Sequence, residues 1–141
     1  MSKTFTTQRM VEFCDTDMAG IMHFASFFHY MESVEHEFIR SLGLSIYTKI
    51  DGQPISFPRV AAKCDFKSPA MCEDVMDAEL TISHIGRTSI TYQIDFSKGG
   101  KPVAHGEVTC VCCNIYHDRP PESIPLPPDV IQLLKPYLVE A

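Results

Sequence analysis

One segment, residues 23–42, places apolar side chains three and four residues apart, which is the repeat of an α-helix rather than of a strand. The apolar positions are Phe24, Phe27, Phe28, Met31, Val34, Phe38 and Leu42. The opposite face carries Ser26, His29, Ser33, His36, Glu37 and Arg40. Gly43 follows, as is typical of a helix C-cap. We therefore predict one long amphipathic helix that buries its apolar face against the rest of the chain.

The segments around this helix have the composition of β-strands, because they are rich in β-branched and apolar residues and are bounded by Gly, Pro or Asp. The predicted strands are residues 5–13, 55–66, 75–84, 88–97 and 103–115. Gly99 and Gly100 can adopt the positive φ angles of a hairpin between the last two strands. After a proline-rich run, residues 129–134 are predicted to form a short helix. This order predicts an α+β domain in which an antiparallel sheet wraps the long helix.

Composition limits the kind of protein that this chain can be. Its 141 residues are 45% apolar and 21% charged, with a net charge of −6, which predicts one globular domain. The negative charge and the lack of a Lys- and Arg-rich run disfavour a nucleic-acid partner. No signal sequence or membrane-length apolar stretch occurs, so we expect a cytoplasmic protein without a membrane partner. In that compartment the six cysteines are expected to be free thiols.

Residues 12–24, EFCDTDMAGIMHF, place two aspartates directly before the predicted helix. Free N–H groups at a helix start can polarise a carbonyl, and a nearby carboxylate can attack that carbonyl or activate a water. Asp15 and Asp17 are the candidate carboxylates, although Asp also commonly caps turns and helix starts. Gly20 permits a close approach of the backbone. The candidate amide donors are those of Met22, His23 and Phe24.

Other polar residues have simpler interpretations. His29, Glu32 and His36 have the spacing of a helical metal site, but the two histidines lie on the polar face, which favours a solvent or subunit contact. Glu35 falls within the apolar stripe, so we expect it to have a partner such as an Arg or to tilt toward water. Residues 110–113, CVCC, contain a Cys-x-x-Cys spacing, yet its ends point to opposite faces of a strand. Buried thiols are therefore predicted there, not a metal site.

Three motifs follow one another in order along the chain. The first is F-x-D-x-D-x-x-G-I-M over residues 13–22, followed by Phe24 and by Glu32 in the helix. The second is V-x-x-x-C-D-F-x-x-P-A over residues 60–70, and the third is G-R-T-S over residues 86–89. Together with the strand at 103–113, these motifs resemble those of hotdog-fold acyl-CoA thioesterases, in the branch typified by 4-hydroxybenzoyl-CoA thioesterase.

The resemblance covers most of the chain and leaves out only the proline-rich tail. It implies a hotdog fold, with a five-stranded antiparallel sheet wrapped around one long helix. It also implies a single domain over residues 1–141, with a proline-rich segment and short helix from about residue 118. The implied activity is hydrolysis of an acyl-CoA thioester to a free carboxylic acid and CoA. CoA is then part of the substrate, and no metal or other cofactor is implied.

The resemblance also assigns roles to individual residues. Asp17 would act as the nucleophile or general base, and Asp15 is interpreted as a residue that shapes the loop. The backbone amide of Phe24, with Gly20 nearby, would stabilise the oxyanion. The candidate substrate contacts are His23, Glu32, Arg87, Thr88 and Ser89, with Lys63 and Lys67 as further phosphate ligands. For His23 a helix cap is the alternative. Because hotdog proteins build sites across subunit contacts, a homodimer or homotetramer is expected.

Two other functions remain open at this point. Hotdog hydratases acting on enoyl or hydroxyacyl thioesters carry an Asp and a His five positions apart in an Asn-Pro turn. Here Asp17 and His23 are six apart and the turn is missing, which disfavours a hydratase. A non-catalytic acyl-CoA-binding protein is the other alternative, and the presence of Asp17 disfavours it. The acyl group, whether aromatic or aliphatic, is not indicated.

Overall fold

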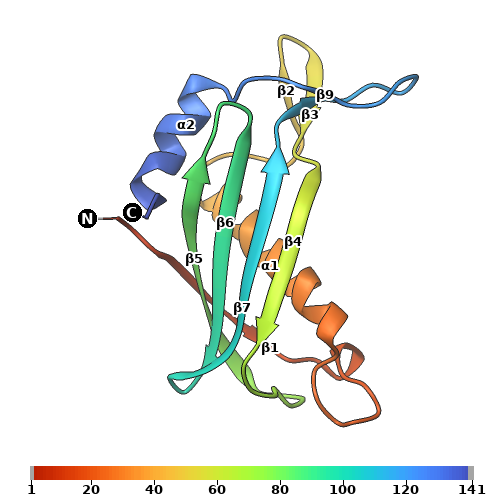
Figure 1. Ribbon diagram of the computed structural model, residues 1–141, viewed down its shortest axis with the longest axis vertical. Coiled ribbons are helices and arrows are strands. Elements are labelled where there is room, and N and C mark those ends of the chain that lie inside the picture. Colours follow the sequence, from red (N-terminus) through yellow and green to blue (C-terminus); the bar gives the residue numbers. More distant parts are fainter. Residues whose placement is uncertain (1, 140–141) are drawn as a thin grey trace.

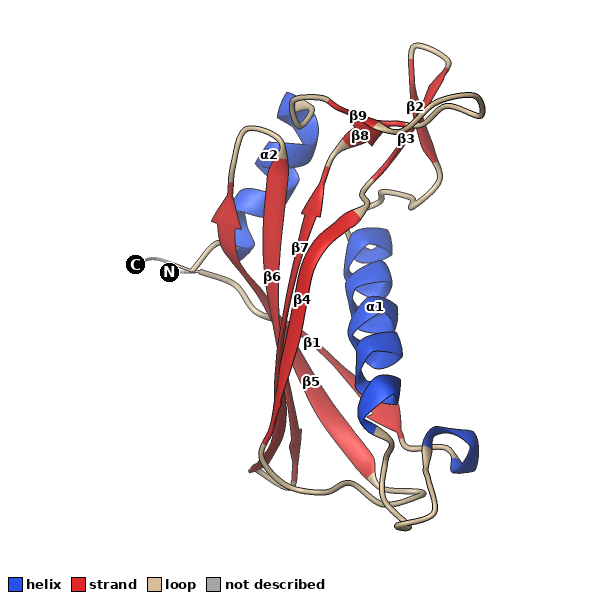
Figure 2. Cartoon of the chain, turned by 45° about the vertical axis from the view of Figure 1, so that its right-hand side comes forward, coloured by secondary structure: helices blue, strands red, loops and turns tan. Residues whose placement is uncertain are grey.

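The computed structural model describes residues 2–139, and its main feature is a five-stranded antiparallel sheet with one long helix along one face (Figures 1 and 2). The strand order is β1-β5-β6-β7-β4. These strands are β1 (Phe5–Met10), β4 (Arg59–Phe66), β5 (Val75–Ile85), β6 (Ser89–Lys98) and β7 (Lys101–Val111), and the helix is α1 (Phe24–Ser41). The predicted α+β class and the central antiparallel sheet are therefore present.

Helix α1 confirms most of the predicted apolar face. Phe27, Met31, Val34 and Phe38 are buried against the sheet. Two assignments were wrong: Phe24 is 61% exposed, and Ser26, expected on the polar face, is buried. Both residues lie at the start of α1, where the Ser26 hydroxyl donates to the Asp15 carbonyl in the preceding loop.

The C-terminal cap of α1 was predicted correctly. Gly43 has a φ of +80° and its N–H donates to the Arg40 carbonyl, while the Leu44 N–H donates to Ile39. The hairpin between β6 and β7 is also confirmed, because Gly99 and Gly100 both have positive φ angles, +56° and +83°.

Three predicted strands were too long. Segment 5–13 ends as a strand at Met10, since Phe13–Asp15 forms a 3₁₀ turn, η1. Segment 55–66 breaks at Phe57 and Pro58, and segment 103–115 breaks at Cys112. The pieces beyond the breaks join a second sheet of order β2-β3-β8-β9, which was not predicted. Its strands are β2 (Thr48–Ile50), β3 (Gln53–Ser56), β8 (Cys113–Asn114) and β9 (Glu122–Ser123).

The two edges of the large sheet differ. β1 pairs with β5 from Val75 to Leu80. Farther along β5, Leu138 of the C-terminal segment forms a parallel bridge with Ile82. This segment follows α2 (Pro128–Leu134) and a 3₁₀ turn, η2 (Lys135–Tyr137). At the other edge, β4 is exposed at every position except Cys64, which is half-buried. β1 and β4 are thus the two edge strands of this sheet within residues 2–139, and β4 is the longer of the two.

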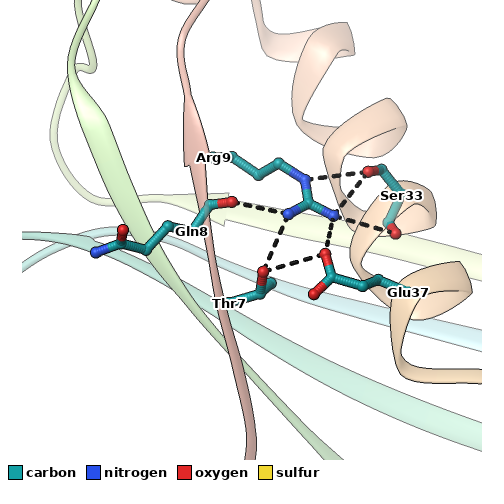
Figure 3. A network of polar contacts seen from close by, with 5 residues as sticks. All are labelled: Thr7, Gln8, Arg9, Ser33 and Glu37. Carbon is teal, nitrogen blue, oxygen red and sulfur yellow. Dashed lines mark hydrogen bonds and ion pairs between the residues drawn. The ribbon is translucent and has the colours of Figure 1, made fainter. Parts of the chain in front are cut away.

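A polar network fixes β1 to α1 just before the loop that contains the aspartates (Figure 3). The Arg9 guanidinium donates to Ser33 Oγ, at 3.1 Å from Nε and 3.0 Å from Nη2, and lies 2.8 Å from Glu37 Oε1. Thr7 Oγ1 donates to the same Glu37 oxygen at 3.1 Å. These hydrogen bonds and the ion pair fix the start of the loop relative to the helix.

None of the helices in residues 2–139 combines the length and apolar character that crossing a membrane requires. The six cysteines are free thiols, and Cys110, Cys112 and Cys113 are buried as predicted.

Candidate active site

The loop between η1 and α1 is a tight hairpin. Thr16 pairs with Met22 in an antiparallel bridge, and the Asp17 N–H donates to the Ile21 carbonyl at 3.0 Å. The turn is closed by the Gly20 N–H, which donates to the Asp17 carbonyl at 2.9 Å. Gly20 has a φ of +79°, a conformation that side chains other than glycine rarely adopt. The hairpin therefore brings Asp17 and Gly20 together next to the helix start.

The two carboxylate oxygens of Asp17 have different surroundings. Oδ1 accepts the Ala19 N–H at 2.8 Å, so the turn-shaping role considered for aspartate is present. Oδ2 has no hydrogen-bond partner among residues 2–139, and the side chain is exposed. One oxygen thus orients the carboxylate while the other is accessible to a ligand or a water.

The start of α1 offers a free backbone donor. His23 is the N-cap, and its Nδ1 accepts the Ala25 N–H at 3.1 Å, so the alternative interpretation as a cap is confirmed. The His23 ring stacks on Phe24 with 4.7 Å between centroids. The Phe24 N–H has no acceptor within residues 2–139, since the first helical amide has no partner in its own helix. An oxyanion could accept this hydrogen bond.

Asp15 has the loop-shaping position expected of it. Its carbonyl accepts the His23 N–H at 2.7 Å and the Ser26 hydroxyl at 3.1 Å. Its carboxylate accepts the Tyr30 hydroxyl at 2.5 Å. Tyr30 was not identified from the sequence, because a tyrosine within a helix carries no signal of such a contact.

The other predicted substrate contacts do not gather around Asp17 in one chain. Glu32 is exposed two turns along α1, about 12 Å from Phe24 at 1.5 Å per residue. Arg87, Thr88 and Ser89 lie beyond the Ile85 end of β5, whereas the Asp17 loop adjoins the Val75 end. These two ends are roughly 30 Å apart, given ~3.3 Å per strand residue.

A cavity of about 200 Å³ also lies at this far end, between the second half of α1, the β2–β3 hairpin and α2. Its lining combines aliphatic side chains, such as Ile39 and Ile55, with polar and charged ones. One wall carries an ion pair: Arg59 Nη1 and Nη2 lie 3.0 and 2.9 Å from the two carboxylate oxygens of Glu35. The Arg partner predicted for Glu35 is therefore present, and burial raises the pKa of Glu35 to about 7 even though Arg59 opposes the rise.

The described residues do not form a metal-binding cluster. Across residues 2–139, no three His, Cys, Asp or Glu side chains are grouped so that they could hold a metal ion. His29, Glu32 and His36 are consequently separate surface or half-buried residues of α1.

Comparison with known proteins defines the family. The sequence profile of the thioesterase-like superfamily matches residues 11–134. This chain belongs to the thioesterase-like superfamily. The predicted family is thereby confirmed, and the thioesterases described next confirm the predicted enzyme class, thioester hydrolase.

Individual thioesterases resemble the chain in sequence and in structure. It is 31% identical over 111 residues to a 1,4-dihydroxy-2-naphthoyl-CoA hydrolase of Synechocystis sp., which is 77% of this chain and 80% of the relative. The solved structure of a 1,4-dihydroxy-2-naphthoyl-CoA thioesterase from Synechocystis superposes with a TM-score of 0.83 and 26% identity, covering 94% and 96% of the two chains. A gentisyl-coenzyme A thioesterase superposes with a TM-score of 0.79 and 27% identity, covering 93% and 99%.

Proposed function

We propose that this member of the thioesterase-like superfamily hydrolyses acyl-CoA thioesters with Asp17 as nucleophile or general base and the Phe24 amide as oxyanion donor. The observation that carries the proposal is the hairpin itself. It fixes one Asp17 oxygen on Ala19, leaves the other oxygen accessible, and returns the chain to an unpaired helix N-terminal amide.

The general-base and nucleophilic mechanisms both use the Asp17 carboxylate and the Phe24 N–H. As a general base, the Asp17 carboxylate takes a proton from water while the water oxygen adds to the thioester carbonyl. As a nucleophile, it adds to the carbonyl itself, and water later hydrolyses the mixed anhydride. In either case the carbonyl oxygen becomes an oxyanion that the Phe24 N–H can stabilise. Collapse of the adduct breaks the C–S bond and releases the CoA thiolate, which takes up a proton.

The substrate class is proposed from the relatives. Those reported above are named for 1,4-dihydroxy-2-naphthoyl-CoA and gentisyl-coenzyme A. Both acyl groups are hydroxylated aromatic acids, so thioesters of such acids with CoA are the first candidates for this chain.

A two-copy assembly along β4 is part of the proposal. β4 is one of the two edge strands of the large sheet and carries Val60 and Phe66, which are 62% and 51% exposed, whereas the other edge strand, β1, is shorter. Exposed apolar edge strands favour pairing with another strand. A second copy of β4 fits that requirement, since two identical edges can pair antiparallel about a two-fold axis.

Such pairing would complete the site. Phe66 lies at the end of β4 nearest the Asp17 loop, because its ring contacts Phe27 in the first turn of α1 at 5.3 Å between centroids. Arg59 lies at the other end, beside the cavity. An antiparallel β4 pair places the Phe66 end of one copy next to the Arg59 end of the other. Asp17 of one copy would then lie at the same end of the paired β4 strands as the candidate phosphate ligands of the other copy, Arg87, Thr88 and Ser89.

Thiol release from a panel of acyl-CoAs tests the activity. The panel contains hydroxylated benzoyl- and naphthoyl-CoAs alongside aliphatic acyl-CoAs, and the enzymes are the wild type, Asp17→Asn and Asp118→Asn. Asp118 is exposed on a loop far along the chain from the hairpin, so it is the matched control. We expect release by the wild type and Asp118→Asn but not by Asp17→Asn. No release from any thioester by the wild type would overturn the proposed substrate class, and full release by Asp17→Asn would overturn the assigned carboxylate.

A further inference from the structure

Tyr30 connects three segments that meet at the candidate active site. It lies in the second turn of α1, and its hydroxyl is 2.5 Å from Asp15 Oδ2 and 2.9 Å from the carbonyl oxygen of Met10, the last residue of β1. One hydroxyl therefore links the end of β1, the loop and the helix. Burial and the neighbouring Asp15 carboxylate raise the pKa of Tyr30 well above its usual range, so this hydroxyl keeps its proton at neutral pH.

Asp15 carries that link on to the first turn of α1. While its side chain accepts the Tyr30 hydroxyl, its carbonyl accepts the His23 N–H at 2.7 Å and the Ser26 hydroxyl at 3.1 Å. The Glu12 N–H also points at Asp15 Oδ2, at 3.4 Å. Asp15 is thus fixed on both its side chain and its main chain.

The hairpin with Asp17 begins at the next residue. Thr16 pairs with Met22, and Asp17 pairs with Ile21, so the hairpin has its two strand ends at Asp15 and His23. Asp15 lies two residues before Asp17, so we expect a shift of Asp15 relative to the helix to move the Asp17 carboxylate relative to the Phe24 amide, which is part of the helix.

We propose that Tyr30 is a positioning residue that acts through Asp15 to hold the Asp17 carboxylate in register with the Phe24 amide. This inference rests on the proposed function, since it explains how the two catalytic groups meet the same carbonyl. A misplacement of about 1 Å in a reacting group can cost about 100-fold in rate. The hydroxyl of Tyr30 is the only side-chain donor to the Asp15 carboxylate within residues 2–139.

Removal of that hydroxyl is the direct test. For Tyr30→Phe we expect kcat to fall ~10- to 100-fold while KM stays within about three-fold, because the substrate contacts remain and only the relative placement of the reacting groups changes. Tyr47→Phe is the matched control: this tyrosine is 89% exposed, and its kcat should equal that of the wild type.

A mutant cycle separates positioning from a general loss of stability. If Tyr30 acts through Asp15, Tyr30→Phe should change kcat by less than about three-fold in an Asp15→Ala background. Equal losses in both backgrounds would overturn the inference, as would a wild-type kcat for folded Tyr30→Phe. Asp17→Asn, assayed in parallel, keeps the two hypotheses apart. If Asp17→Asn is inactive and Tyr30→Phe is normal, only this inference fails; if Asp17→Asn is fully active, the proposed function fails as well.

Discussion

Arg59, on the edge strand β4, holds both carboxylate oxygens of Glu35 within the apolar face of α1, at 2.9 and 3.0 Å. The Glu35 side chain is 6% exposed and that of Arg59 is 31% exposed, so the acid is the more desolvated partner. Burial consequently dominates and raises the pKa of Glu35 from 4.5 to about 7.

This pair predicts how stability depends on pH. Because the pKa of Glu35 is higher in the folded state, the protonated form of Glu35 favours folding. This contribution to the free energy of unfolding is fully present below pH 4.5 and is lost as pH rises through about 7. The shift corresponds to about 3 kcal/mol of unfolding free energy. Urea unfolding of wild type and Glu35→Gln at pH 5 and pH 8, at fixed protein concentration, should show this loss in the wild type and a much smaller loss in the variant. Parallel pH dependence in the two proteins would contradict the prediction.

Proline at position 24 tests the Phe24 N–H as oxyanion donor, because the proposed mechanism gives the Phe24 side chain no role. Phe24→Pro removes the N–H, yet proline is favoured at the first helical position, and His23 already has the extended ψ of 139° that a following proline requires. We expect kcat to fall ~100- to 1,000-fold, the effect of deleting one oxyanion donor. Phe24→Ala keeps the N–H and serves as the control, with kcat expected within about ten-fold of wild type. Comparable rates for the two variants would argue against the amide.

The exposed apolar residues of the edge strand β4 predict self-association through this strand. Val60→Glu places a charge on this edge, which should shift the protein toward monomers in sedimentation velocity and lower kcat/KM together with the dimer fraction. Val139→Glu makes the same exchange at another exposed valine, 41% exposed, and should leave the association state unchanged. A Val60→Glu protein that still associates like the wild type would exclude β4 as the interface.

Local sequence patterns predicted the parts of the fold that are determined by residues close together in the sequence. The helix over 23–42 and the hairpin at Gly99 were found because periodicity and turn geometry act over a few positions. The second sheet was missed because β3 and β8 pair Ile55 with Asn114, a contact that no local pattern specifies. One signal was available: Asp51 and Gly52 both have positive φ angles, 51° and 79°, in the β2–β3 turn, and Asp-Gly is a strong hairpin sequence.

The candidate site was predicted in its parts rather than in its arrangement. The two aspartates, Gly20 and the helix start could be selected from the sequence, and the family resemblance favoured Asp17 over Asp15 as the catalytic carboxylate. The hydrogen bonds add what the sequence does not contain: the Asp15 carboxylate accepts the Tyr30 hydroxyl, whereas Asp17 keeps one oxygen accessible. The distance between Asp17 and Arg87 depends on sheet topology, which a list of motifs does not contain.

Single-turnover thiol release by Asp17→Asn, with acyl-CoA affinity measured on the same preparation, is the most direct test of Asp17 as the catalytic group. We predict a rate at least ~1,000-fold below that of the wild type, with the dissociation constant changed by less than about five-fold, because the amide keeps the hydrogen bond to Ala19 but can neither attack nor accept a proton. A rate within about ten-fold of the wild type, at unchanged affinity, would contradict this role for Asp17.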